Sequence, residues 1–421
     1  MGRTTRNRKQ PHPRPVQKIN LSEKNFHWRV AAMILLLAIG LAALMYALIS
    51  YLSVDPGWRE IEVSSNELSC GEDFTFNYQI GASGISASAE QKAITKKYSD
   101  ATVKAYRLFC NNQSFENETN VFDINQHPNE TVRVDDVLYQ AFELLQSQNR
   151  RELYLAPVYL NYENLFCCQD DVETISFDPY ENQELADEFS QLTAYARDPE
   201  SVNLELLGDG NVRLYVSEEY QTFASEYGYT NYIDFFWMKN AFIIDYLAEE
   251  MKNGGYKRGI LSSCDGFIRN LDESGTEFTF QIYDRVDQTI YPAASMHYTD
   301  AGSIIYLHDY QMTEREEWYY YERKDGQIRT PYIDITDGLC KSSVSNLVSY
   351  SKESSCSEIL MQILPIYIAD TFQKEKLTTL SENGIYSIYC ENYTIWHNDN
   401  YLTLTDYYAD ENIVYTSSVI K

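Results

Sequence analysis

The chain carries none of the common catalytic motifs, and its candidate chemical groups are acidic residues set in short, separate motifs. There is no GxSxG, HExxH, P-loop or GxGxxG pattern. The histidines at 127, 297, 308 and 397 have no partner at metal-ligand spacing and are typical of satisfied surface or core histidines. Nucleophile-elbow, zinc-hydrolase and phosphate-loop chemistries are therefore not indicated, and the order of the weaker motifs has to carry the argument.

The weaker motifs follow one another along the chain in this order: Val121–Asn125, Val132–Gln146, Leu153–Pro157, Ile233–Asp245, Ser262–Gly266, Asp325-Gly326 with Tyr332–Gly338, and Cys356–Leu364. This order resembles the ApbE family, the magnesium-dependent FAD:protein FMN transferases. The resemblance covers the chain from about Phe74 to Trp396, and no single motif is intact. It implies an α+β fold of the ApbE type, related to the T-fold, in which helices pack on mixed sheets.

The family's strand–turn–helix motif, I-D-L-G-G-I-A-K-G-Y-A-V-D, falls on Ile233–Asp245. Phe236 and Trp237 stand where the family has a Gly pair, which lets backbone approach a flavin nucleotide closely. Asn240 stands where the family has Lys, and a one-residue slip would place Lys239 there instead. The family's Gly-Gly-Asp becomes Ser263-Cys264-Asp265. The resemblance implies these cofactor-binding residues: Asp234, Lys239, Asn240, Asp245, Ser263 and Cys264.

The implied reaction cleaves the FAD pyrophosphate and esterifies FMN onto a Thr or Ser of a target protein. The resemblance assigns catalytic roles to Asp265 and Asp334, although the His of the family's H-I-I-D motif is missing here. The family's metal-binding Asp and Thr fall on Glu358 and Gln362, one helical turn apart and both carrying oxygen ligands that suit Mg²⁺. A solvated or hydrogen-bonded polar pair is the alternative interpretation of those two residues.

Three functions remain open from the sequence. The first is an active FMN transferase that uses FAD and Mg²⁺. The second is an ApbE-like domain that binds a nucleotide-like ligand or a protein partner without turnover, with the tyrosines suited to stacking. The third is an unrelated surface domain with an adhesive or cell-envelope role. Flavin binding and FMN release would separate the first two from each other and from the third.

An uncharged apolar run, Val30–Leu52, precedes most of the chain and would anchor it to a membrane. At ~1.5 Å rise per residue this run spans roughly 34 Å, enough to cross a ~30 Å hydrocarbon core. The flank 1–29 has 8 basic and 1 acidic residues, or +7, whereas the remainder has 34 − 8 = 26 basic and 62 − 1 = 61 acidic residues, or −35. The positive-inside rule predicts a single-pass cell-membrane protein with an extracytoplasmic C-terminal domain. A cleaved signal peptide is the alternative, with a shorter apolar region.

Composition limits the rest. The acidic balance disfavours nucleic acid as a partner. The resemblance to the ApbE family implies instead a protein substrate or an envelope partner. All eight Cys follow the apolar run, where both disulfides and free buried thiols are open to them. Weak N-x-[ST] sequons lie at Asn112, Asn117, Asn129 and Asn392. We expect a disordered basic tail at 1–29, the membrane anchor at 30–52, a juxtamembrane linker at 53–73 and an ApbE-like domain at 74–421.

Periodicity and turn residues predict the elements of this domain. Helices are expected over 90–111, 134–146, 234–251 and 358–371. Strands are expected over 74–80, 202–206, 212–216, 259–263, 277–283, 303–309, 318–322, 344–350, 384–389 and 393–396, where the domain should end. This mixture predicts the α+β class.

Overall fold

The computed structural model describes residues 26–52, 54–81 and 83–420. The chain divides into a first compact unit that ends at Val54 and a second that runs from Asp55 to Lys421. In the first unit, α1 (Phe26–Leu52) contains the predicted span Val30–Leu52. Its segment Phe26–Ala47 has a mean hydropathy of 2.5 and is long and apolar enough to cross a membrane. Most of the predicted basic tail, residues 1–25, lies outside the described residues.

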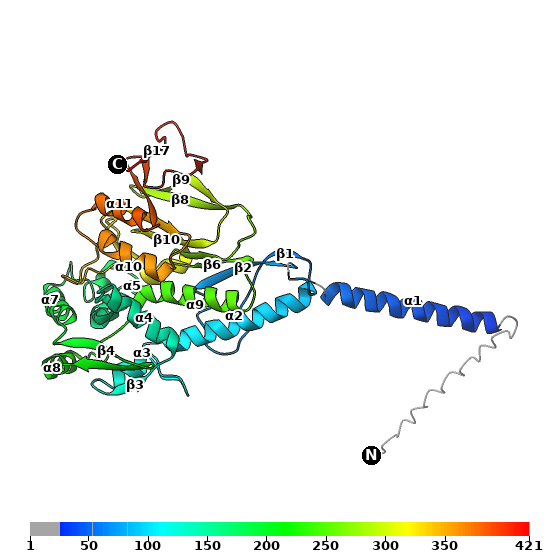
Figure 1. Cartoon of the computed structure of the whole chain (residues 1–421), viewed down its shortest axis with the longest axis horizontal. Helices are drawn as coiled ribbons and strands as arrows, with labels where there is room; N and C mark the ends of the chain where they lie inside the picture. The colour runs from blue at the N-terminus through cyan, green and yellow to red at the C-terminus, as the bar shows by residue number, and fades with distance from the viewer. Residues whose placement is uncertain (1–25, 53, 82, 421) are drawn as a thin grey trace, which may run out of the picture. The chain divides into compact units, whose positions relative to one another are not determined.

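The second unit is built on a long sheet of nine strands among the described residues, visible in Figure 1. Adjacent strands are antiparallel except the last pair, β15 and β17. β10 is buried along almost its whole length, as expected of a strand covered on both faces. The strand order is β1 (Gly57–Glu60), β2 (Phe74–Ile80), β6 (Gly259–Ser263), β7 (Phe267–Asn270), β10 (Gly302–His308), β13 (Asn346–Ser351), β14 (Tyr386–Glu391), β15 (Thr394–His397) and β17 (Thr416–Val419).

A small sheet covers one face of this long sheet. Its strand order is β16 (Leu404–Thr405), β9 (Thr289–Tyr298) and β8 (Phe278–Val286). Ile282, Ala294 and Met296 of the small sheet pack with Ile304, Val348 and Ile388 of the long sheet in one buried apolar cluster. Burial of this apolar surface holds the two sheets together, since each buried CH₂ contributes ~0.8 kcal/mol.

Helices α9 and α10 pack on the long sheet, and α2 packs on both α9 and β2 (Figure 1). Further helices and a second small sheet, β3-β5-β4, form the remainder of this unit. The helix bounds are α2 (Ala87–Phe109), α3 (Val121–Gln126), α4 (Asp136–Ser147), α5 (Ala156–Phe166), α6 (Asp171–Thr174), α7 (Gln183–Arg197), α8 (Glu218–Tyr227), α9 (Lys239–Asn253), α10 (Cys356–Tyr367) and α11 (Lys374–Glu382). The remaining strands are β3 (Thr131–Arg133), β4 (Val202–Gly208), β5 (Asn211–Val216), β11 (Tyr321–Glu322) and β12 (Ile328–Arg329).

Several sequence-based expectations need correction. The range 53–73, expected to be a linker, contains β1, which pairs with β2 and extends the long sheet. The range 318–322, expected to be a strand, is a strand only at β11, Tyr321–Glu322. Its first two residues end a 3₁₀ helix, Glu314–Tyr319, because a capping box at Thr313 and Glu316 starts a helical turn there. Two strands that were not predicted, β16 and β17, follow residue 396 within the predicted domain 74–421. The predicted helix 234–251 begins at Lys239, after a 3₁₀ turn.

Candidate functional site

Asp234 anchors the turn that leads into α9. Its backbone N–H donates to the Leu153 carbonyl at 2.9 Å, and its Oδ1 accepts from the Phe236 N–H at 2.8 Å. Its Oδ2 accepts from Asn111 Nδ2 at 2.6 Å. Burial raises the pKa of Asp234, and these donors oppose the rise only in part. The carboxylate therefore has a structural role in shaping the turn where sequence analysis expected a cofactor.

Phe236, at the position of the family's first Gly, adopts a left-handed backbone conformation with φ +50°. A bulky residue rarely takes this conformation, and glycine takes it without cost. The Phe236 ring is buried and stacks on Tyr159, with ring centroids 4.6 Å apart. Trp237 is also buried and meets the Tyr332 ring edge-on at 5.0 Å. The chain thus keeps a glycine-like bend, but aromatic rings fill the space beside it.

Lys239, at the first turn of α9, lies among carboxylates that come from four separate parts of the chain. Burial lowers its pKa, but the negative charges of Asp234, Asp73, Glu163 and Asp265 outweigh burial and raise the pKa above its usual value. Burial in turn raises the pKa of Glu163 to about 7, and Asp234 adds to that rise. Lys239 is therefore charged in the folded protein and compensates this acidic cluster.

Asp265 and Asn240 form the polar centre of the site. Asn240 Nδ2 donates to Asp265 Oδ2 at 3.0 Å and contacts the Tyr319 hydroxyl at 3.4 Å. Asp265 Oδ1 and Asn240 Oδ1 are buried without a hydrogen-bond partner among the described residues. Burial raises the pKa of Asp265 to about 7, and the Ser263 and Asn240 side chains lower it only in part. These two oxygen atoms are therefore the acceptors of the cluster to which a bound group could still donate hydrogen bonds.

The neighbouring residues Ser263 and Cys264 shape the turn between β6 and β7. Ser263 Oγ accepts from the Phe267 N–H at 2.9 Å, and the Cys264 N–H donates to the Asp73 carbonyl at 2.8 Å. Burial, and then the Asp265 charge, raise the pKa of the Cys264 thiol. Both residues therefore hold Asp265 in place, and the thiol stays protonated at neutral pH.

Asp245 belongs to a separate structural cluster. Its carboxylate accepts from the backbone N–H groups of Cys356 (2.9 Å) and Ser357 (2.7 Å) at the start of α10, and from Ser357 Oγ (2.7 Å). It also forms an ion pair with Arg269 Nη1 at 2.8 Å. These four contacts occupy the carboxylate. Asp245, a residue of α9, therefore caps the N-terminus of α10 and links the two helices.

Asp334 also lies in a network of its own. Its Oδ1 accepts from the Thr336 N–H at 2.7 Å, and its Oδ2 pairs with Lys341 Nζ at 2.9 Å. Lys341 pairs in addition with Asp337 at 2.8 Å and Asp370 at 2.9 Å. Burial alone would raise the pKa of Asp334, but the Thr336 amide and Lys341 hold it below its usual value.

Glu358 and Gln362 do not form a set of ligands that fits Mg²⁺. Glu358 is exposed, and one of its carboxylate oxygens accepts from the Ser355 N–H at 2.8 Å in a capping box. Among the described residues, no group of three or more His, Cys, Asp or Glu side chains could hold a metal ion. Magnesium requires near-octahedral oxygen coordination, which this helix terminus does not supply. The residues at the Gly-pair positions likewise do not fit a flavin approached by backbone, because Phe236 and Trp237 fill that space.

The structure thus brings together part of the predicted set, namely Asp234, Lys239, Asn240 and the turn 263–265, and leaves the other predicted residues elsewhere. It adds Asp73, Glu163 and Tyr319, which sequence analysis missed. Asp73 falls in the range expected to be a linker, and Tyr319 in a range expected to be a strand. Glu163 lies on α5 and faces Lys239 only through the tertiary fold, so no local sequence signal could have identified it.

Comparison with known proteins places the fold. No protein-family model matches the sequence, and no curated protein matches it. Solved structures of similar fold include the following two. The ApbE protein from Thermotoga maritima has a TM-score of 0.54 and 13% identity, covering 79% of this chain and 94% of that chain. The flavin transferase ApbE from Vibrio cholerae has a TM-score of 0.53 and 15% identity, covering 82% and 96%. The chain therefore has an ApbE-like fold, preceded by one apolar helix that could span a membrane.

Proposed function

We propose that this chain is a membrane-anchored, extracytoplasmic ApbE-like domain that binds a ligand or a protein partner and does not transfer flavin. The observation that carries the proposal is the glycine-like bend at Phe236. The ring of this residue packs on Tyr159 in the place where the family motif keeps backbone free of side chains. A flavin could bind there in the family manner only if both Phe236 and Trp237 moved out of a packed interior, which would cost several kcal/mol.

The proposed orientation rests on charge. A basic flank of +7 precedes α1, and such flanks stay in the cytoplasm. The acidic domain that follows would then face outward, where it could meet other envelope proteins.

One observation favours a second candidate, which is retained transfer of FMN from FAD to a Thr or Ser of a target protein. Within the part of the chain that the structure describes, the buried oxygens Asp265 Oδ1 and Asn240 Oδ1 have no hydrogen-bond partner, as in a site that awaits a bound group. In that candidate Asp265, with a pKa of about 7, would accept the proton of the attacking hydroxyl.

Incubation of the full chain, in detergent micelles, with FAD and magnesium chloride separates the two candidates. Flavin fluorescence reports binding. Chromatography reports AMP, which leaves when the FAD pyrophosphate is cleaved, and free FMN, which forms when water takes the place of the target hydroxyl. We expect no AMP or FMN release from the wild-type chain. Release that is lost in Asp265→Asn would contradict the proposal and establish the second candidate.

A double variant, Phe236→Gly with Trp237→Gly, tests the reason for the inactivity. If the two rings exclude flavin, the double variant should bind FAD more tightly than the wild-type chain. The matched control is Phe223→Gly with Phe166→Gly, two buried aromatic residues away from the bend. Equal FAD binding by both double variants would mean that general loosening, and not removal of these two rings, admits the flavin.

A further inference from the structure

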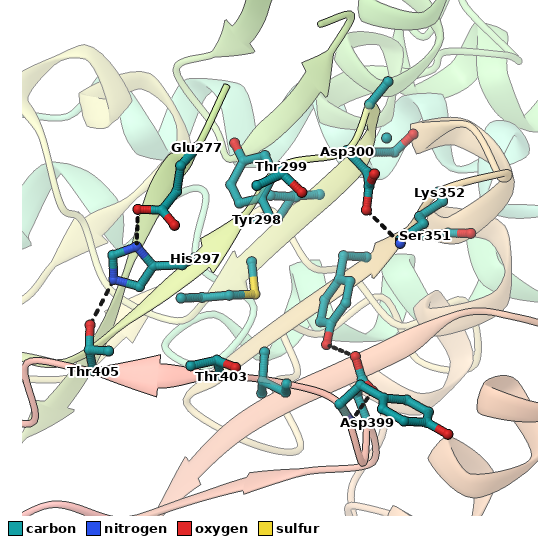
Figure 2. A pocket seen from close by; sticks show the side chains of 18 residues that line it. Glu277, His297, Tyr298, Thr299, Asp300, Ser351, Lys352, Asp399, Thr403 and Thr405 are labelled. Carbon is teal, nitrogen blue, oxygen red and sulfur yellow. Dashed lines mark hydrogen bonds and ion pairs between the residues drawn. The ribbon is translucent and has the colours of Figure 1, made fainter. Parts of the chain in front are cut away.

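A cavity of about 570 Å³ lies between the small and long sheets, away from every motif position discussed above. Figure 2 shows the residues that line it. They are Glu277, the end of β9, the turn 299–301, the start of β10, the end of β13 with Lys352, and residues of the segment 399–405. Its volume is within the ~300–1,000 Å³ range of small-molecule sites. None of its lining residues belongs to the cluster around Lys239, so the cavity is a separate feature of the fold.

The cavity walls are largely apolar and aromatic. Met296, Ile304 and Leu402 supply aliphatic surface, and Tyr298 and Tyr350 supply aromatic rings. Burial raises the pKa of the Tyr298 phenol to about 12, so this ring stays neutral at physiological pH. Tyr401 also lines the cavity, and its side chain is 92% exposed. An exposed ring at a cavity mouth is free to cover an incoming ligand.

The charged groups around the cavity leave an excess of negative charge. Lys352 Nζ pairs with Asp300 Oδ2 at 2.6 Å (Figure 2), so these two charges compensate each other. Glu277 lies 3.5 Å from Nδ1 of His297, and Asp399 is a further carboxylate. His297 aside, the lining holds three carboxylates and one lysine, a formal charge of −3 + 1 = −2.

Two hydrogen bonds hold the carboxylate of Asp399 toward the cavity. Its Oδ2 accepts from the Tyr350 hydroxyl at 2.8 Å, and its Oδ1 accepts from the Tyr401 N–H at 2.8 Å. His297 Nε2 contacts Thr405 Oγ1 at 2.7 Å, which ties the segment 399–405 to β9 (Figure 2). The carboxylate of Asp399 is therefore fixed in position before any ligand arrives, which lowers the entropic cost of binding.

We propose that this cavity binds a small organic cation, an amine or guanidinium attached to a planar or apolar body. The apolar walls would take the body, and the tyrosine rings would contact its face. Glu277 and Asp399 would attract the charged group, and the ring faces add a cation–π contribution of ~0.5–2 kcal/mol. The negative lining disfavours an anion of the same shape.

Tryptamine and indole-3-propionate are suitable probes, because they share an indole body and carry opposite charges. Binding to the full chain in detergent micelles is measured by calorimetry and by saturation-transfer NMR. We expect tryptamine to bind about tenfold more tightly than indole-3-propionate, and its affinity to fall with added salt as surface charges are screened. Equal affinity of the two probes, or no binding of tryptamine at millimolar concentration, would overturn the proposal.

Two variants assign the binding to this cavity. Glu277→Gln removes one charge from a side chain that is 67% exposed, and should weaken tryptamine binding about two- to fivefold. Tyr401→Ala removes an exposed ring and should weaken both indole probes. Glu226→Gln, an exposed carboxylate on α8 outside the cavity, is the matched control and should leave binding unchanged. If Glu277→Gln and Tyr401→Ala bind tryptamine as the wild-type chain does, the cation site is not in this cavity.

Discussion

At the scale of single residues, the left-handed conformation of Phe236 is the clearest departure from what its residue type prefers. The motif resemblance placed Phe236 at a glycine position of the family. It did not show whether the backbone would leave the glycine-like conformation or the side chain would be accommodated in it. The structure shows that the backbone keeps φ +50° and that the ring is accommodated by stacking on Tyr159. The residue is therefore strained locally and stabilised by packing.

The strained backbone and the packed ring of Phe236 together predict that its glycine variant is more stable than its alanine variant, the reverse of the usual order. Phe236→Ala should lower the free energy of unfolding by about 3–5 kcal/mol, because it leaves a cavity beside Tyr159. Phe236→Gly should cost about 1 kcal/mol less than Phe236→Ala, because glycine adopts this φ without strain. Urea unfolding of the two variants measures the difference.

Trp237 provides the control for this prediction, since it is buried at the next position and does not have a positive φ in the described chain. There Trp237→Gly should be less stable than Trp237→Ala. The same order at both positions would mean that Phe236 is not strained.

Asp265 predicts a pH dependence of stability. Its pKa of about 7 in the folded protein lies above the value of about 3.9 expected in the unfolded chain. Between these two values the folded protein holds a proton that the unfolded chain has lost, so stability falls as the pH rises from about 4 to about 7. Asp265→Asn removes this contribution. The free energy of unfolding of the variant, relative to that of wild type, should therefore be on the order of 1–3 kcal/mol higher at pH 8 than at pH 4.

Thermal unfolding at both pH values measures this change, with Glu226→Gln as the exposed control. Asp73, Lys239 and Tyr319 face the same site, and Glu163 also has a raised pKa of about 7, so a residual slope is expected in the variant. A slope as steep in Asp265→Asn as in the wild-type chain would argue against the raised pKa.

At the scale of elements, α9 and α10 depend on each other through Asp245. The ion pair that it forms with Arg269 is largely buried, with side chains 15% and 10% exposed, and the same carboxylate caps α10. The helix predicted over 358–371 overlaps α10, Cys356–Tyr367, because helical periodicity is a local signal. The contact between Asp245 and the start of α10 joins residues 111 positions apart, and no local pattern encodes it.

Asp245→Ala should therefore lower the free energy of unfolding by about 3–5 kcal/mol, since it leaves Arg269 without a buried partner and α10 without its cap. Amide hydrogen exchange should accelerate at residues 356–359. Glu358→Ala, which removes an exposed capping-box carboxylate from the same helix, should cost only about 1 kcal/mol. Similar costs for the two variants would mean that Asp245 acts as an ordinary surface cap.

The strands, like α10, were predicted where their own residues carry the signal and were missed where pairing with another strand defines them. The alternating strand 74–80 and the short strand 259–263 were predicted at their observed bounds. β1 and β16 were missed because they are short and are defined by pairing with β2 and β9, not by their own composition. The carboxylates Asp73 and Glu163 were missed for the same reason, because only the folded chain brings them to Lys239.

At the scale of the whole molecule, the apolar helix and the acidic domain together predict a sidedness that can be measured. Cys167 is an exposed free thiol of the second unit. A membrane-impermeant maleimide should label right-side-out vesicles that contain the chain and should leave inverted vesicles unlabelled.

The variant Cys167→Ser with Cys168→Ser should lose this labelling, which confirms that the signal arises from these thiols. Labelling of inverted vesicles alone would place the domain in the cytoplasm. A labelled soluble fragment in the medium would instead mean that α1 is a cleaved signal peptide.

The long sheet begins with β1, directly after the apolar helix, and its opposite edge is β17, four residues that end at Val419. β17 lies parallel to β15, and the Ile420 N–H donates to the His397 carbonyl at 2.8 Å. Without β17, β15 would be the edge strand on this side of the sheet, and its unpaired N–H and C=O groups would be open to pairing with other strands. These four residues therefore act as a seal on a sheet edge that would otherwise favour association between chains.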